Sequence, residues 1–482
     1  MTKRRPARKG QPESPGSPRV IVLAAGLGTG MRSTLPHVLH RVAGRTLLET
    51  VLDTAETLSS SPIVLLLGAS RGQIEPLLSG RRVTIAASDP AHGTAQAVRR
   101  VLVELGEQDV PVLVLAADVP LIQADTLRRL LDRQRTEGLD LVFLSFRPPD
   151  AGDLGRVVRD RTGRILRIAE EAKSSARERR DVEAPTGIFC FRRGALENAL
   201  QRLAKGPGAE RRDLASTVEI LAPGKKVEAL EAEDWREAWG IHTRRELAAA
   251  EEIAHRRGIE RALEAGATLI DPSTTRIGPT VSIEPDTVIH PFVMLEGRTA
   301  LLSGCEIFSF TRIADSRIAS QAVIGPHCDV EGATVGERAR VGPFARLRPG
   351  TVLEADVRVG NFVEIKQAVL GRGVKALHLS YLGDAEIGAE ANIGAGVITC
   401  NFDGQAKNRT IIGPGAFVGS DSQLVAPVTV GEGAFVGAGS TITEDVPPGA
   451  LALTRVAQKN EEGWVERRKK KTTRRRGDAE TR

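Results

Sequence analysis

Short apolar runs alternate with helical patterns along the first half of the chain. From Val20 to about Leu230, β-branched runs such as VIVLAAG, PIVLLLGA and VPVLVLAADVPLI are followed by amphipathic stretches such as LLETVLDTAETL and ADTLRRLLDRQR. This alternation is typical of βαβ units, which build a mostly parallel sheet covered by helices. It predicts an α/β, Rossmann-like domain over residues 20–234. The stretch RRELAAAEEIAHRRGIERALEAGA then predicts a helical linker over residues 235–268.

The second half of the chain has a period of six residues. Aliphatic residues recur at every sixth position, often with a glycine directly after them. A hexapeptide β-helix requires this spacing, because each aliphatic side chain fills a narrow prism whose corners are turned by small residues. Residues 269–465 are therefore predicted to form a left-handed parallel β-helix. The three series are Ile277, Ile283, Ile289, Leu295, Leu301, Ile307, Ile313; Val335, Val341, Leu347, Leu353, Val359; and Ile412, Val418, Leu424, Val430, Val436, Ile442.

The basic residues are concentrated at the two ends. The 482-residue chain has a net charge of +6, but residues 1–19 carry +5 and residues 467–482 carry +7, which leaves −6 for the body between them. Charge runs of this kind are usually solvated and disordered. Residues 1–19 and 466–482 are therefore predicted to be disordered basic tails. Nucleic-acid binding is not expected, although a scaffold that binds RNA or anionic surfaces through these tails stays an alternative.

The spacing of the cysteines and the hydropathy of the chain indicate the cellular compartment in which the protein is expected. Cys190, Cys305, Cys328 and Cys400 stand far apart without a C-x-x-C pair, which favours neither a disulfide framework nor a zinc site. No stretch approaches the roughly 18 apolar residues that a membrane span needs, and the basic start lacks a signal-peptide core. A cytoplasmic protein without a membrane span is expected.

Candidate chemistry lies where the six-residue period is interrupted, in KALHLSYLGDAEIGAEANIGAGVITCNFDGQAKNRTIIG. His378 stands there near Tyr381, Asn392, Asn401 and Lys407, after segments that hold Arg348 and Lys366. A neutral imidazole can accept a proton from an ammonium group that becomes a nucleophile, while Arg and Lys can fix a phosphate. A general base beside a phosphate clamp is predicted.

The runs GPFARLRPG, GNFVEIK, HLSYLGDAEIG, NIGAGVITCNFDG, VGSDSQLVAPVTVG and EGW carry a resemblance. They closely resemble the acetyltransferase domain of the bacterial bifunctional N-acetylglucosamine-1-phosphate uridyltransferase and glucosamine-1-phosphate acetyltransferase. The resemblance implies a homotrimer that transfers an acetyl group from acetyl-CoA to glucosamine-1-phosphate, directly and with His378 as proton acceptor. It implies sugar-phosphate contacts at Arg348, Lys366, Tyr381 and Asn392. The implied acetyl-CoA contacts are Ala395, Asn401, Phe402, Ser420, Ala438 and Arg455, with Phe402 in the place of the family's usual Tyr.

The same resemblance extends over Val20 to about Ala250, where the family has a sugar-nucleotide pyrophosphorylase. A glycine-rich turn after a strand lets backbone amides approach a nucleotide, as LAAGLGTG can. Asp118 is the implied Mg²⁺ ligand, and UTP is the implied nucleotide. The implied nucleotide contacts are Leu23, Ala24, Ala25, Gly26, Gly93, Thr94, Gly155 and Glu170.

The chain departs from the family's pattern at several ligand-facing positions. Gly30 and His37 replace an Arg and a Lys, and such cations stabilise the charge that develops in phosphoryl transfer. Further replacements are Ser88 for Gln, Ala117 for Gly, Pro185 for Asn and His242 for Asn. We therefore expect an acetyltransferase of UDP-N-acetylglucosamine biosynthesis whose uridyltransferase-like site is degenerate. In the alternative, a fully bifunctional enzyme, Arg32 or Lys173 would supply the missing charge.

Overall fold

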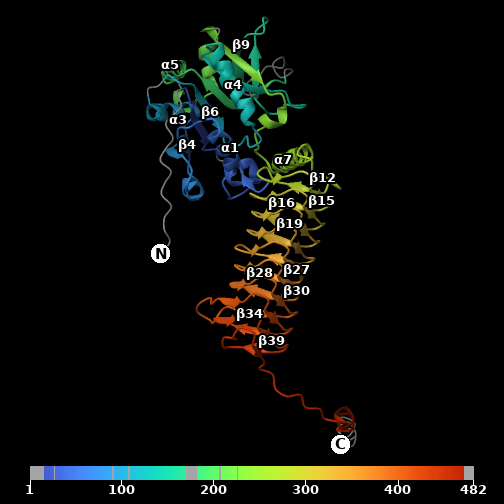
Figure 1. Cartoon of the computed structure of the whole chain (residues 1–482). Coiled ribbons are helices and arrows are strands. Elements are labelled where there is room, and N and C mark those ends of the chain that lie inside the picture. The colour runs from blue at the N-terminus through green and yellow to red at the C-terminus, as the bar shows by residue number, and fades with distance from the viewer. Residues whose placement is uncertain are drawn as a thin grey trace, which may run out of the picture. The chain divides into compact units, whose positions relative to one another are not determined.

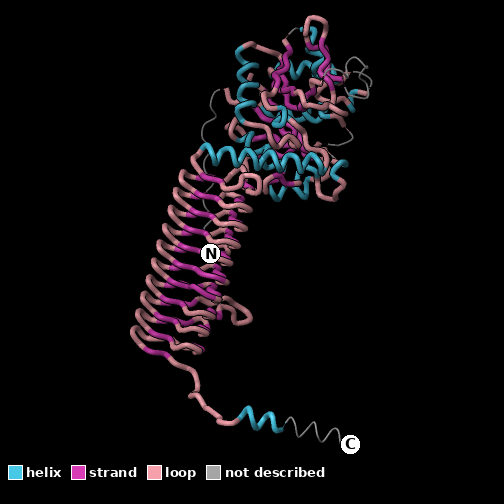
Figure 2. The backbone as a smooth tube through the Cα atoms, turned by 90° about the vertical axis from the view of Figure 1, so that its right-hand side faces the viewer, coloured by secondary structure: helices cyan, strands magenta, loops and turns pink. Residues whose placement is uncertain are grey.

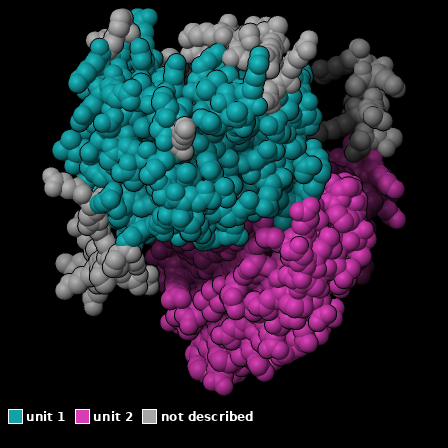
Figure 3. Space-filling model, turned by 90° about the horizontal axis from the view of Figure 1, so that it is seen from above, with its two compact units in different colours: residues 1–258 teal, residues 259–482 magenta. Residues whose placement is uncertain are grey.

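A computed structural model describes residues 16–26, 28–88, 92–106, 109–169, 182–205, 208–224 and 226–471. The chain divides into two compact units, residues 1–258 and residues 259–482 (Figure 3). Separate apolar cores fill the two units. The domain boundaries drawn from the sequence at residues 234 and 268 stay predictions.

A seven-stranded sheet forms the centre of the first unit (Figure 1). The strand order is β11-β7-β10-β6-β1-β4-β5; β10 runs antiparallel to both neighbours, and the other pairs are parallel. The predicted α/β domain with a mostly parallel sheet is thus confirmed. The strands are β1 (Arg19–Ala24), β4 (Ile63–Leu67), β5 (Val83–Ala87), β6 (Val112–Ala116), β7 (Leu141–Phe146), β10 (Ala184–Phe191) and β11 (Val227–Glu231); two small ribbons pair β2 (Arg41–Val42) with β3 (Arg45–Thr46) and β8 (Arg156–Arg159) with β9 (Ile165–Ala169).

Helices cover both faces of this sheet because successive strand residues point to opposite sides. On β1, Val20 and Val22 join the core with α1 and α4, whereas Ile21 joins the core with α3, α5 and α6. A capping box between Thr46 and Glu49 begins α1. The helices are α1 (Leu47–Glu56), α2 (Arg71–Ile74), α3 (Thr94–Val101), α4 (Ala124–Thr136), α5 (Arg193–Leu203), α6 (Ser216–Leu221) and α7 (Arg244–Glu264).

The predicted linker region contains a single-turn 3₁₀ helix over Trp235–Ala238 followed by α7. The long helix thus begins nine residues after the start of the predicted linker, because the segment from Trp239 to Thr243 is not helical. Among the described residues, no helix is both long and apolar enough to cross a membrane.

The second unit is a left-handed β-helix of three parallel sheets (Figure 2). The first sheet has 11 strands, from β12 (Thr268–Leu269) to β41 (Leu451–Ala452). The second has 10, from β13 (Arg276–Ile277) to β40 (Thr441–Ile442), and the third has 9, from β14 (Ser282–Ile283) to β38 (Val428–Val430). Apart from the half-buried Ile283, all residues of the three predicted aliphatic series are buried, so the hexapeptide prediction is confirmed.

The period is interrupted over a much shorter stretch than the sequence suggested. Leu370 pairs with Ile387, which is 17 residues further on, but Ile387 pairs with Ile412, which is 25 residues further on. Residues 375–393 keep their places in the ladders, so the extended interruption was wrong. A loop over residues 401–409, closed by a bridge between Phe402 and Lys407, leaves the solenoid beside β34 (Ile398–Cys400; Figure 1).

Part of the predicted C-terminal tail is helical. Residues 464–471 form a helix, where the sequence predicted disorder from residue 466. Arg468 lies over the ring of Trp464 one turn earlier, 4.9 Å from its centroid, and the Arg and Lys residues that follow are good helix formers. Residues 1–15 and 472–482 of the predicted tails lie outside the described residues.

Candidate active sites

One corner of the solenoid brings six positions from successive coils into a single column. Five registered pairs run through the first sheet, from Val359–Ala376 to Val436–Ala452. The residue two positions after each member therefore occupies the same corner. We call this column the corner strip; it consists of Asn361, His378, Ala395, Ser420, Ala438 and Thr454. It contains the predicted proton acceptor and three of the predicted acetyl-CoA contacts, and the predicted contact Arg455 donates to the carbonyl of Ala438 at 2.9 Å.

Within the strip, His378 contacts the coil before it. Its Nδ1 lies 2.8 Å from Oδ1 of Asn361, which is its registered neighbour on β27 (Arg358–Asn361). An amide oxygen only accepts, so the Nδ1–H donates and the lone pair of the neutral ring stays on Nε2. The ring of His378 is exposed, so this Nε2 is open to a ligand.

Paired charges lie on the neighbouring second sheet. Arg348 donates to Glu364 at 2.9 Å, and the Nζ of Lys366 lies 3.2 Å from Oδ2 of Asp384. Oδ2 of Asp384 also accepts a hydrogen bond from the Asn401 side chain. The structure thus joins three of the predicted site residues, Arg348, Lys366 and Asn401, to carboxylates that hold their positions.

The loop over residues 401–409 adds a cation that was not among the predicted contacts. Lys407 lies beside Lys366, and this neighbouring ammonium lowers the pKa of Lys407, with Arg348 adding to the effect. Lys407 is thus repelled by Lys366 and Arg348, and a bound phosphate would stabilise this group of cations. The signal in the sequence was a lysine within the segment that interrupts the six-residue period.

A close approach positions Tyr381. A Cβ at Gly383 would lie 2.5 Å from the Tyr381 hydroxyl oxygen, so the ring packs closely over Gly383 and would have to shift if this residue had a side chain. Tyr381 also sits in register with Glu364 on β28 (Glu364–Lys366), next to the cations of that sheet. The hydroxyl is therefore fixed beside Lys366.

Two predicted contacts lie apart from this group. Asn392 belongs to β33 (Asn392–Ile393) on the first sheet, in register with Lys375. Phe402 is exposed on the loop. Asn361 was missed by sequence reasoning, although it stands 17 residues before His378, which is the spacing of one coil.

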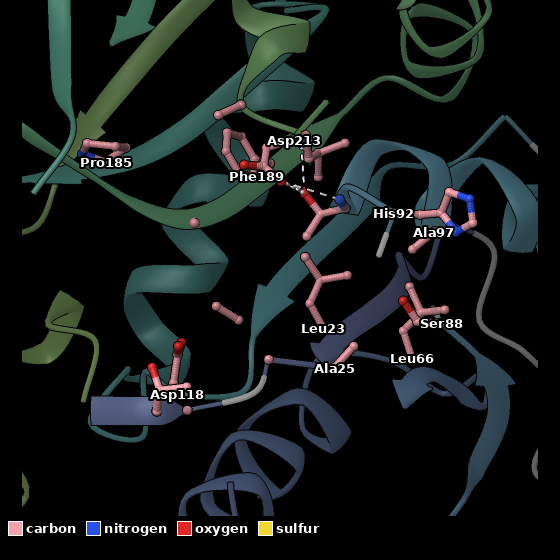
Figure 4. A pocket seen from close by; sticks show the side chains of 18 residues that line it. Leu23, Ala25, Leu66, Ser88, His92, Ala97, Asp118, Pro185, Phe189 and Asp213 are labelled. Carbon is pink, nitrogen blue, oxygen red and sulfur yellow. Dashed lines mark hydrogen bonds between the residues drawn. The ribbon is translucent and has the colours of Figure 1, made fainter. Parts of the chain in front are cut away.

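The first unit contains a cavity of about 690 Å³ at the carboxyl ends of β1, β4 and β6 (Figure 4). Parallel α/β sheets bind ligands at this edge. Four of the predicted nucleotide contacts line the cavity: Leu23, Ala25, Gly26 and Thr94. Asp118 lines it as well, at the opposite end from Ser88 and His92 in Figure 4.

The other predicted nucleotide contacts do not line this cavity. Ala24 is buried on the other face of β1, and Gly93 packs so tightly on Arg212 that a Cβ would lie 2.1 Å from its carbonyl oxygen. Gly155 packs beside Pro185. Both Glu170 and Lys173 lie outside the described residues.

Thr94 has a structural role at the start of α3. Its hydroxyl accepts from the Leu214 N–H at 2.8 Å, which ties the segment before α6 to the cavity. Asp213 and Leu214 thereby become lining residues, as does Phe189 on β10. Sequence reasoning missed these three because they come from a part of the chain about 100 residues further on.

The residues that line the cavity agree with the replacement of Arg and Lys noted in the sequence. The described lining residues include two carboxylates, Asp118 and Asp213, and one imidazole, but neither Lys nor Arg. Arg32 is exposed and is not among the residues that line it. A Cβ at Gly30 would lie 2.6 Å from the carbonyl oxygen of His242, so the family's arginine has no room at this position.

The predicted Mg²⁺ ligand has an imidazole as its neighbour. Nδ1 of His242 lies 3.5 Å from Oδ2 of Asp118. Mg²⁺ requires oxygen ligands in near-octahedral geometry. The described donor set beside Asp118 therefore does not fit Mg²⁺.

Comparisons with known proteins agree with this arrangement. Residues 20–219 match the model of the MobA-like NTP transferase domain, and residues 409–444 match the bacterial transferase hexapeptide (six repeats). The chain is 41% identical to the bifunctional protein GlmU of Pelobacter propionicus, over 94% of this chain and 99% of the relative. It is 42% identical to GlmU of Stutzerimonas stutzeri over 94% and 99%, and 42% identical to GlmU of Streptomyces avermitilis over 93% and 94%.

A nucleotidyltransferase domain followed by a hexapeptide β-helix defines a transferase with two different domains. The chain belongs to the family of the bifunctional protein GlmU. The resemblance noted in the sequence is thus confirmed. The interpretation of the first site as degenerate gains no support from these relatives, which are all named as bifunctional proteins.

Proposed function

We propose that the second unit transfers an acetyl group from acetyl-CoA to the amine of glucosamine-1-phosphate. The corner strip carries this proposal, since it aligns His378 with Ala395, Ser420 and Ala438 on consecutive coils. An acyl donor extended along the strip would bring its thioester to the imidazole. This accounts for the contacts that the resemblance implies.

In the proposed mechanism, Nε2 of His378 accepts a proton from the substrate amine. The amine nitrogen then forms a bond to the thioester carbon, the C–S bond breaks, and the departing thiolate takes the proton from His378. The N–H of Ala395 donates no hydrogen bond to another described residue and adjoins His378 in the strip, so it is the proposed donor to the oxyanion.

The cation cluster of Arg348, Lys366 and Lys407 is the proposed site of the sugar phosphate. Two of its members are already held by carboxylates, so little side-chain entropy is lost on binding. Tyr381 adds a hydroxyl at the same place. Asn392, on the first sheet, is the remaining proposed contact.

A trimer of this chain is the proposed assembly. Phe292, Phe310, His327, Phe344 and Phe362 form an exposed aromatic ridge along the corner, with ring centroids 4.8 to 5.3 Å apart. Contiguous exposed apolar surface marks interaction sites. Leu379, beside His378, continues the ridge, so a second copy seated on it would also lie beside the acetyl-transfer site.

A second function is proposed for the first unit. The family and the cavity at the carboxyl edge of the sheet support binding of UTP and N-acetylglucosamine-1-phosphate there, with transfer of UMP as the reaction. The described lining lacks Lys and Arg, so we expect this half-reaction to be slow with Mg²⁺ as the metal.

Separate assays of the two half-reactions on the purified full chain test both proposals. GlmU of Pelobacter propionicus is the comparator. We expect acetyl transfer at a comparable rate and Mg²⁺-dependent pyrophosphate release lower by about 10³ or more. Equal uridyl transfer in both proteins would refute the expected loss. Absence of both activities, together with salt-dependent RNA binding, would favour the scaffold.

A further inference from the structure

Three side chains of the first unit converge next to the nucleotide cavity. His37 begins a 3₁₀ turn (His37–Leu39), Asp118 follows β6, and His242 lies just before α7. One ligand atom from each residue lies within 4.8 Å of the others. The rings of the two histidines have centroids 5.8 Å apart and are tilted by 40°. We call this group the His-His-Asp cluster.

The backbone of Ile241 holds the cluster together. Its N–H donates to the carbonyl of Asp118 at 2.8 Å, and its own carbonyl accepts a hydrogen bond from the His37 ring. Ile241 is fully buried and directly precedes His242. The segments that carry all three side chains are therefore fixed to one residue, and such outer hydrogen bonds orient metal-binding imidazoles.

Two glycines, Gly28 and Gly30, pack closely against the two histidines of the cluster. A Cβ at Gly28 would lie 2.2 Å from Cβ of His37, and Gly30 packs on the carbonyl of His242. The loop thus closes over the two histidines. A side chain at either position would displace a histidine of the cluster.

The donor set has the chemistry of a transition-metal site. Two imidazoles and one carboxylate suit Zn²⁺, Co²⁺ and related divalent ions, which bind nitrogen strongly, whereas Mg²⁺ selects oxygen. Donors about 2.1 Å from a tetrahedral ion stand about 3.4 Å apart. The 3.5 Å between His242 Nδ1 and Asp118 Oδ2 agrees with this separation. Three protein ligands would leave a coordination position open, and Asp118 faces the cavity.

We propose that the His-His-Asp cluster binds one divalent transition-metal ion in preference to Mg²⁺. Nitrogen donors occupy the places where the resemblance led us to expect a lysine and an asparagine, so the metal preference of this site has changed. The proposal concerns metal binding and does not depend on either proposed activity.

Binding of Co²⁺ and Zn²⁺ to the tag-free, metal-stripped full chain tests the proposal in the absence of substrate. We expect one equivalent of Zn²⁺ per chain by calorimetry, a visible absorption band for bound Co²⁺, and no displacement by a thousandfold excess of Mg²⁺. His37→Lys and His242→Asn should each weaken Zn²⁺ binding at least tenfold. Asp118→Asn, which preserves shape, should do the same if a histidine variant fails to fold.

His290→Asn is the matched control. His290 lies 3.0 Å from Glu306 in the second unit, and the described residues give this pair no third ligand. The control should therefore bind Zn²⁺ as the unmodified chain does. Absence of stoichiometric binding, displacement by a thousandfold excess of Mg²⁺, or equal loss in the control would overturn the proposal.

Discussion

The Nδ1 of His378 lies 2.8 Å from Oδ1 of Asn361, one coil earlier in the solenoid. The two residues are registered neighbours, so the repeat itself sets this contact. It fixes both the orientation of the imidazole and the nitrogen that keeps the lone pair. The solenoid thus acts as a rigid support for the proposed base.

Asn361 is therefore predicted to be a positioning residue. Asn361→Ala should lower kcat of acetyl transfer about tenfold, because the imidazole of His378 loses its orientation. KM should change little, because the residues that bind the substrate stay in place. Asn361→Asp keeps an accepting oxygen and should recover most of the rate. Steady-state kinetics of both variants measure this. Equal losses in the two variants would mean that the amide has only a structural role.

Lys407 is predicted to bind the phosphate. Lys407→Ala should raise KM for glucosamine-1-phosphate about tenfold and leave KM for acetyl-CoA unchanged, because one of three clustered cations is lost. The control is Arg409→Ala two residues further on, whose side chain is paired with Glu386 at 3.0 Å. If Arg409→Ala raises KM as much, the increase reflects a change in the loop as a whole and not the loss of the Lys407 cation.

Thiol reactivity is predicted to report on the acetyl-CoA site. Burial raises the pKa of Cys190 to about 12 and those of Cys305 and Cys328 to about 11, so these thiols stay protonated at pH 8. Burial raises the pKa of Cys400 as well, but Cys400 is only half-buried, unlike the other three, and it adjoins Asn401. A thiol reagent should therefore modify Cys400 first, and saturating acetyl-CoA should slow the reaction. Peptide mapping identifies the modified residue; reaction unaffected by acetyl-CoA would place the ligand elsewhere.

Gly30 is predicted to be required for close packing of its loop against His242. Gly30→Ala should destabilise the first unit by about 1 to 3 kcal/mol, because its Cβ would meet the His242 carbonyl. Gly72→Ala is the control, since a Cβ there meets no atom within 4 Å and helical alanine is favoured over glycine. Denaturant unfolding measures both, and unchanged stability of the first variant would contradict the packing.

The sequence predicted what depends on periodicity. The six-residue spacing predicted the β-helix, and the βαβ alternation predicted the α/β domain. Both patterns are visible because every repeat has to bury its apolar residues. Contacts between coils, such as that of Asn361 with His378, follow only once the register is known. The contact of His37 with His242 could not be predicted, because the two residues are 205 positions apart and their contact depends on how the loops fold over the sheet edge.

The proposed role of His378 is tested by the initial rate of acetyl-CoA-dependent N-acetylation of glucosamine-1-phosphate, measured for the unmodified full chain and for His378→Ala. General-base catalysis contributes about 10² to 10⁴ to the rate. We expect the unmodified chain to turn over and His378→Ala to lose about 10² or more in kcat, with little change in either KM. Near-normal turnover by His378→Ala, or no acetylation by the unmodified chain, would contradict it.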